Sequence, residues 1–153
     1  MDLSTHRDLG IGYKDMGLHD AAINEFQRLA QDPHYEVFAL TMIGECHEAK
    51  GSLGDAVAFY KRALNRPSVA DGEATALYYQ LGSAFQALGD RNEAIYFFEK
   101  VAKREAGFRD VRRRLDEARG HGAAPVARLV SPLVDSDSIN DAFDAILGSK
   151  TRR

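Results

Sequence analysis

Apolar residues recur at helical spacing through the first part of the chain, and glycines interrupt the pattern at regular intervals. The stretch 9–26, LGIGYKDMGLHDAAINEF, carries apolar residues three and four positions apart on both sides of Gly17. A glycine in this place can adopt the left-handed conformation that ends a helix. The pattern therefore predicts a helix over 3–16, a tight turn, and an antiparallel helix over 19–31.

The same pattern returns at 43–60, IGECHEAKGSLGDAVAFY, and at 81–98, LGSAFQALGDRNEAIYFF. The offsets are 34 residues (9 to 43) and 38 residues (43 to 81), and the four additional residues fall in the loop-like stretch NRPSVADGE. Each copy repeats small residues where helices approach closely, a glycine at the turn, and rings between the helices. The small residues are Gly10, Gly44, Gly82, Ala22, Ala56 and Ala94; the turn glycines are Gly17, Gly51 and Gly89; the rings are Tyr13, Phe26, His47, Tyr60, Phe85 and Phe98. Three copies in phase predict an all-α array, with further helices over 36–50, 53–65, 72–88 and 91–104.

Two more amphipathic segments follow the repeats. In 108–119 the apolar residues share one face and arginines the other, which predicts a helix that covers the last apolar surface of the array. Residues 120–137 lose this periodicity and contain two prolines, which predicts a linker. Residues 138–148 predict a short amphipathic helix, which needs a surface to bury its stripe because so short a helix is marginal alone. The main residues of this stripe are Ile139, Phe143, Ile146 and Leu147.

The repeats resemble those of the tetratricopeptide repeat (TPR) family, whose pattern runs from Leu-Gly through an aromatic, an alanine and a second aromatic to a proline. The resemblance implies a right-handed α-solenoid of three TPR-like helix hairpins, followed by the capping helix and the short docking helix. The repeats are expected at about 3–34, 37–70 and 75–107, so that the array with its cap occupies 1–119. The chain departs from the pattern at His47, which replaces an aromatic, and in the third copy, which lacks the closing proline.

In this family the first helix of each repeat lines a concave groove that receives peptides. Carried over to this chain, the groove positions are Arg7, Ile11, Lys14, Phe38, Thr41, Glu45, Glu48, Tyr79, Ser83 and Gln86. The resemblance implies that Ile11, Phe38 and Tyr79 contact apolar ligand residues, while the charged members fix the register of the ligand. Chaperone-binding members of the family hold a terminal carboxylate with Lys and Asn where this chain has Arg7 and Ile11, so that clamp is absent.

These features predict a non-catalytic scaffold or adaptor for protein–protein interaction, whose groove binds a peptide or an amphipathic helix. The C-terminal segment leaves three alternatives open. It is a built-in pseudo-ligand that a partner displaces, a segment exchanged between chains, or a partner's recognition peptide joined to the array. The first repeat also resembles repeats of large bacterial scaffold proteins, some of which organise cell poles, pili or motility.

Composition and charge add two expectations. The chain has 153 residues, a single cysteine and a net charge of −3, and it contains neither a secretory-type start nor an apolar run of membrane-spanning length. We therefore expect a cytoplasmic protein without a membrane partner. Residues 100–119 carry 8 basic and 4 acidic side chains, a net charge of +4. The run 112–114 of three arginines raises the alternative of a nucleic-acid-associated adaptor, although no aromatic residues interleave it.

No constellation typical of an enzyme, a metal site or a cofactor site appears. Cys46 and His47 are neighbours on a predicted helix and point in different directions, and no second Cys or His stands at ligand spacing. The stretch 135–141, DSDSIND, lacks a ligand and the glycine of a calcium loop. The sequence predicts no catalytic residue, no metal and no cofactor.

Overall fold

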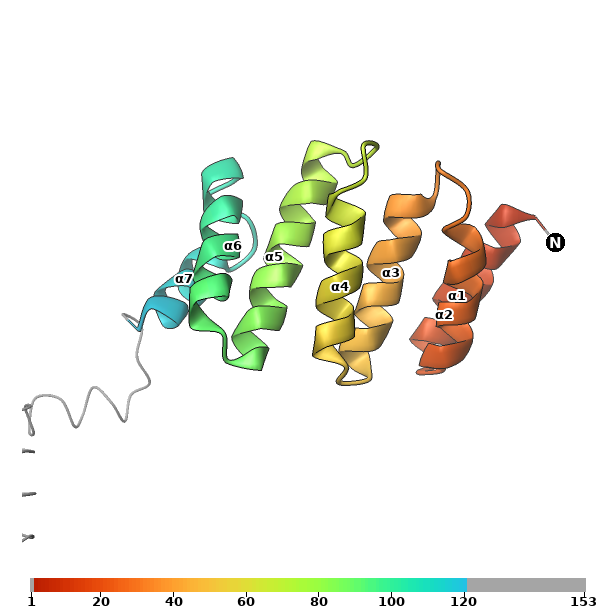
Figure 1. Cartoon of the computed structure of the whole chain (residues 1–153), viewed down its shortest axis with the longest axis horizontal. Helices are drawn as coiled ribbons and strands as arrows, with labels where there is room; N and C mark the ends of the chain where they lie inside the picture. Colours follow the sequence, from red (N-terminus) through yellow and green to blue (C-terminus); the bar gives the residue numbers. More distant parts are fainter. Residues whose placement is uncertain (1, 121–153) are drawn as a thin grey trace, which may run out of the picture. The chain divides into compact units, whose positions relative to one another are not determined.

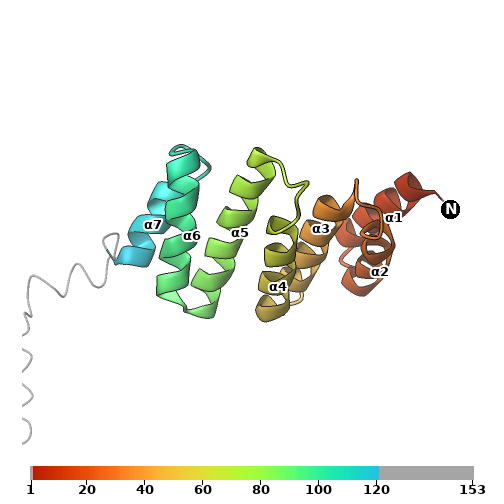
Figure 2. The ribbon, with the colours of Figure 1, turned by 45° about the horizontal axis from the view of Figure 1, so that its top comes forward.

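The computed structural model describes residues 2–120, and these form seven α-helices without a strand (Figure 1). Each helix packs against the next in chain order, from the α1–α2 pair to the α6–α7 pair. Figures 1 and 2 show this succession from two directions. The helices are α1 (Leu3–Asp15), α2 (His19–Leu29), α3 (Glu36–Ala49), α4 (Leu53–Leu64), α5 (Asp71–Leu88), α6 (Arg91–Arg104) and α7 (Val111–Arg119). The described part of the chain is therefore an all-α solenoid of three helix pairs and a final helix.

The predicted linker beyond Gly120 and the predicted helix over 138–148 lie outside the described residues. The six predicted helices of the repeats are confirmed to within two residues at each end. The final helix begins at Val111 rather than at residue 108, because Arg109 adopts a positive φ of 45° and so breaks the helical path.

Glycines end the first helix of every pair, as the sequence predicts. Gly17, Gly51 and Gly89 have φ angles of 79°, 83° and 82°, which other residues adopt only at a cost. In this conformation the chain satisfies its last helical carbonyls and turns directly into the second helix. The prediction for the three turns is confirmed.

A second set of glycines explains how the two helices of each pair come together. A Cβ on Gly44 would lie 2.5 Å from a ring atom of Tyr60, and equivalent contacts of 2.6 and 2.7 Å occur at Gly10 and Gly82. In each repeat a fully buried ring from the second helix therefore lies directly against the backbone of the first. The predicted close approach is confirmed, and its cause is this ring.

Continuous apolar packing joins one pair to the next. One cluster combines Val37 and Leu40 of α3 with Leu77 and Leu81 of α5, across the boundary between the second and third repeats. The last cluster joins the third repeat to Val111 and Leu115 of α7. Helix α7 thus covers the apolar end of the array, as a cap does in solenoid proteins.

Candidate functional site

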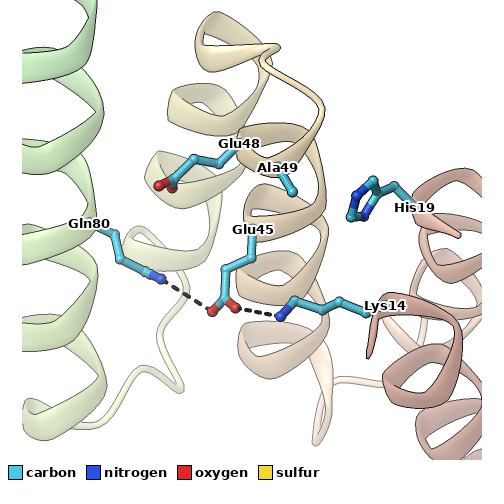
Figure 3. Close-up of a pocket in the computed structure, with 6 residues that line it drawn as sticks. All are labelled: Lys14, His19, Glu45, Glu48, Ala49 and Gln80. Atoms are coloured by element: carbon cyan, nitrogen blue, oxygen red, sulfur yellow. Dashed lines mark hydrogen bonds and ion pairs between the residues drawn. The ribbon is translucent and has the colours of Figure 1, made fainter. Parts of the chain in front are cut away.

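The first helices of the three repeats are linked by polar contacts centred on Glu45 (Figure 3). Lys14 Nζ of α1 lies 3.1 Å from Glu45 Oε1, and Gln80 Nε2 of α5 donates to Glu45 Oε2 at 3.2 Å. The Lys14 and Glu45 side chains are 28% and 27% exposed. Because Glu45 lies on α3, its carboxylate connects residues that are far apart in the sequence and brings all three repeats to one site.

These three side chains, together with His19, Glu48 and Ala49, line a hollow of about 440 Å³ (Figure 3). We call it the Glu48 hollow. Glu48 Oε1 accepts a hydrogen bond of 2.6 Å from the hydroxyl of Tyr60. Burial, and then this bond, raise the pKa of Tyr60, so the phenol stays protonated and remains a donor.

The hollow carries an uncompensated negative charge. Its lining contains one lysine and two glutamates, and Lys14 pairs with Glu45. No ion pair among residues 2–120 includes Glu48, whose described partner is the neutral Tyr60. An exposed carboxylate held in place at a concave site is suited to a cationic side chain of a ligand.

Two buried polar atoms in the same hollow lack a hydrogen-bond partner within the described residues. They are His19 Nδ1 and Gln80 Oε1. Buried polar atoms are normally satisfied, so these two are exceptions, and both are shielded from solvent in this conformation. His47 Nδ1 is also unsatisfied, but its ring stacks on Phe59 at 5.3 Å, which gives this side chain a packing role.

The remaining residues predicted for the first two repeats lie in differing surroundings. Ile11 is 37% exposed, and half-buried Phe38 meets the Phe26 ring edge-on at 6.1 Å. Both present apolar surface. The other two form local bonds: Arg7 Nε lies 3.2 Å from Asp8, and the Thr41 hydroxyl donates to the carbonyl of its own helix one turn earlier at 2.8 Å.

The predicted residues of the third repeat are brought together by one side chain of α7. The Arg114 guanidinium donates to Gln86 Oε1 at 2.8 Å, Ser83 Oγ at 2.9 Å and the Tyr79 hydroxyl at 3.2 Å. Tyr79 is only 8% exposed, and its own hydroxyl donates to Asp110. This bond lowers the pKa of Asp110, while burial raises the pKa of Tyr79. Helix α7 therefore already covers the Tyr79 ring, and this leaves little of the ring exposed for the apolar ligand contact that the resemblance implies.

The three consecutive arginines of α7 have separate environments. Arg112 is exposed, Arg113 forms ion pairs with Asp110 and Glu117, and Arg114 is engaged with α5. Because two of the three are held by side chains of this chain, they do not present a continuous surface for phosphate groups. The geometry does not favour the nucleic-acid alternative.

Residues 2–120 contain no group of three or more His, Cys, Asp or Glu side chains arranged to hold a metal ion. None of the helices α1 to α7 combines the length and apolar character needed to cross a membrane. Cys46 is fully buried, and burial raises the pKa of its thiol.

The stacked helix pairs define an α-solenoid repeat protein, a class that uses its extended surfaces to bind other proteins. Within that class, the family model of the tetratricopeptide repeat matches residues 39–67 and 75–107. The predicted resemblance is confirmed. The chain is accordingly a protein-interaction scaffold in its general class.

Solved structures share this fold at low sequence identity. Two crystal structures of MamA are each 23% identical to this chain, with TM-scores of 0.66 and 0.65; both matches cover 79% of this chain, and they cover 70% and 66% of the MamA chains. The TPR2AB domain of yeast Sti1, solved as a complex with pHSP90, is 15% identical with a TM-score of 0.72. That match covers 98% of this chain and 57% of the Sti1 chain. Comparison with curated proteins gave no significant match.

Proposed function

We propose that this protein is a non-catalytic scaffold or adaptor whose first helices bind a peptide or an amphipathic helix at the Glu48 hollow. The observation that carries the proposal is a site that three repeats build together and that holds a carboxylate, Glu48, without an ion-pair partner among residues 2–120. A ligand with a lysine or arginine would place that cation beside Glu48. The proposed location is the cytoplasm, where a buried single thiol stays reduced.

Different residues of the first helices would make different contacts with the ligand. Ile11 and half-buried Phe38 supply apolar surface on the first helices of the first two repeats. Lys14 keeps Glu45 neutralised, so that the net charge of the site resides on Glu48. In a helix-in-groove complex, apolar anchors of this kind provide affinity and the charged contact provides register.

Two kinds of occupant are compatible with the proposal. One is an amphipathic helix of another protein, which can carry the Lys or Arg that pairs with Glu48. The other is the chain's own segment 138–148, in cis or exchanged between chains, which has no such cation and would bind through its apolar stripe alone. The resemblance of the first repeat to bacterial scaffold proteins extends the proposal to a role in cell polarity or motility.

A peptide-display selection against the full chain tests this function. We expect the recovered peptides to share an apolar pattern at helical spacing and at least one Lys or Arg. Glu48→Gln, which keeps the shape and the acceptor for Tyr60, should weaken their binding by about tenfold, since a charged contact contributes about 1.5–3 kcal/mol. Asp55→Asn removes an exposed carboxylate elsewhere and is the matched control. Recovery of no common motif, or equal binding to Glu48→Gln, would refute the proposal.

A further inference from the structure

The second helices form a furrow whose chemistry is opposite to that of the Glu48 hollow. It has a volume of about 250 Å³ and is lined by residues of α4 and α6 together with Tyr78 of α5. Lys61 and Lys100 are the charged residues of its lining, and Leu64 supplies apolar surface. Tyr96 also lines it and is 51% exposed, which is unusual for so large a ring in this chain. We call this site the α4/α6 furrow.

Cationic side chains at the α4/α6 furrow lie over aromatic rings. Lys100 Nζ lies 5.0 Å from the ring centre of Tyr96 and 5.5 Å from that of Tyr78. The Arg104 guanidinium is 5.2 Å from the same Tyr78 ring. Two cations that share one ring repel each other, and the ring offsets only part of that repulsion.

Carboxylates of the described chain do little to neutralise this charge. Arg104 has only a long contact of 4.0 Å to the exposed Asp71. No ion pair among residues 2–120 includes Lys61 or Lys100. A segment that brings carboxylates together with apolar side chains would therefore gain both charge neutralisation and burial of the Tyr96 ring.

The chain contains such a segment. Residues 133–147, LVDSDSINDAFDAIL, contain four aspartates, no lysine or arginine, and apolar residues that include Ile139 and Phe143. The Glu48 hollow would repel this acidic segment, whereas the two lysines of the furrow would attract it. Charge therefore favours the α4/α6 furrow over the Glu48 hollow as the docking site of segment 133–147.

The covalent connection is long enough for the segment to bind its own array. Twelve residues separate Gly120 from Leu133, and their extended reach is about 40 Å. Helix α6, which forms one wall of the furrow, is about 21 Å long and packs against α7. A tether of this length also gives an effective concentration in the millimolar range, which favours the intramolecular complex over a second copy.

We propose that the α4/α6 furrow is a docking site for the chain's own acidic segment 133–147. This site lies on different residues from the Glu48 hollow, so either assignment can fail while the other stands. Docking would hold the end of the chain on the second helices and leave the hollow open to a partner.

Nuclear magnetic resonance relaxation of the full ¹⁵N-labelled chain tests the docking. We expect backbone order parameters of residues 138–147 near those of the array in the unaltered chain, and below about 0.6 in Lys61→Glu/Lys100→Glu. The control Arg91→Glu/Lys103→Glu makes the same charge change at exposed α6 positions outside the lining and should leave the order parameters unchanged. Adding Asp141→Lys/Asp144→Lys to the furrow variant should restore them.

Three results would overturn the proposal. The first is low order in the unaltered chain, and the second is high order that survives the furrow substitutions. The third is order that depends on protein concentration between about 20 and 500 µM, which would identify a second copy as the source of the segment. High order that is lost in Ile11→Ser but kept in the furrow variant belongs to the second result and would assign the segment to the exposed apolar surface of α1.

Discussion

The interior of the three repeats is the same, whereas the faces that they present differ. Each repeat buries one glycine–ring contact, and the pairs are Gly10 with Phe26, Gly44 with Tyr60, and Gly82 with Phe98. The residue that follows each of these glycines is not shared. Ile11 is exposed and apolar, Glu45 joins three repeats, and Ser83 accepts a hydrogen bond from α7. Since each repeat of a solenoid contacts only its neighbours, the shared interior sets the stack and the unshared face determines what it binds.

The comparison predicts its largest effect at the buried ring of the third repeat. Phe98→Ala should lower the free energy of unfolding by about 3–5 kcal/mol, because Phe98 is fully buried and its loss leaves a cavity. Leu88→Ala, at the end of α5, should change it by about 0.5 kcal/mol, because that side chain is half exposed. Urea denaturation followed by circular dichroism measures both. Equal losses of stability in the two variants would mean that the buried interior does not contribute more to folding than the exposed face.

The glycine under each ring should be the next most sensitive position. Gly44→Ala places a methyl group 2.5 Å from Tyr60 and should destabilise the array by about 1–3 kcal/mol. Gly12 is also within a helix, but a Cβ there would meet nothing within 4 Å, so Gly12→Ala should stabilise by up to about 1 kcal/mol. Opposite signs in thermal denaturation support the close approach, and a stabilising Gly44→Ala contradicts it.

A polar contact on the face should matter much less for folding. Lys14→Gln removes the ion pair with Glu45, whose two side chains are more than a quarter exposed. Solvent screens such pairs, so we expect a loss under about 1 kcal/mol in the same denaturation measurement. A loss as large as that of Phe98→Ala would show that this polar contact, rather than the interior, holds the repeats together.

The smallest effect concerns the first cap and depends on pH. Hydrogen bonds from the Thr5 side chain and backbone lower the pKa of Asp2 from 3.8 to about 2. Because the folded pKa lies below the unfolded one, the stabilisation is present above about pH 4 and is lost as the pH falls through about 2. Titration of the Asp2 carboxyl carbon by nuclear magnetic resonance should give a value near 2. In Thr5→Ala the value should move toward 3.8, and an unchanged value would exclude the Thr5 hydroxyl as a cause.

The sequence was sufficient for the elements that repeat. Helices, turn glycines and buried rings recur with one period, so three weak local signals supported one another. The bond from Arg114 to Gln86 crosses 28 residues and has no counterpart in another repeat, so no periodic signal indicated it. His19 and Gln80 were missed for a related reason: neither stands at a family groove position, and packing of α1, α3 and α5 brings them to the hollow. Lys14 and Glu45 were predicted as groove residues, whereas their pairing became visible only in three dimensions.

The central claim is that Glu48 holds a cationic side chain of a peptide ligand, and a double-mutant cycle tests it most directly. Isothermal titration calorimetry would give four dissociation constants, for a displayed peptide and its Lys→norleucine form against the unaltered chain and Glu48→Gln. We expect the norleucine change to weaken binding at least fivefold to the unaltered chain and to have no effect on Glu48→Gln, a coupling of about 1 kcal/mol or more. Equal losses against both proteins would give zero coupling and would contradict the claim.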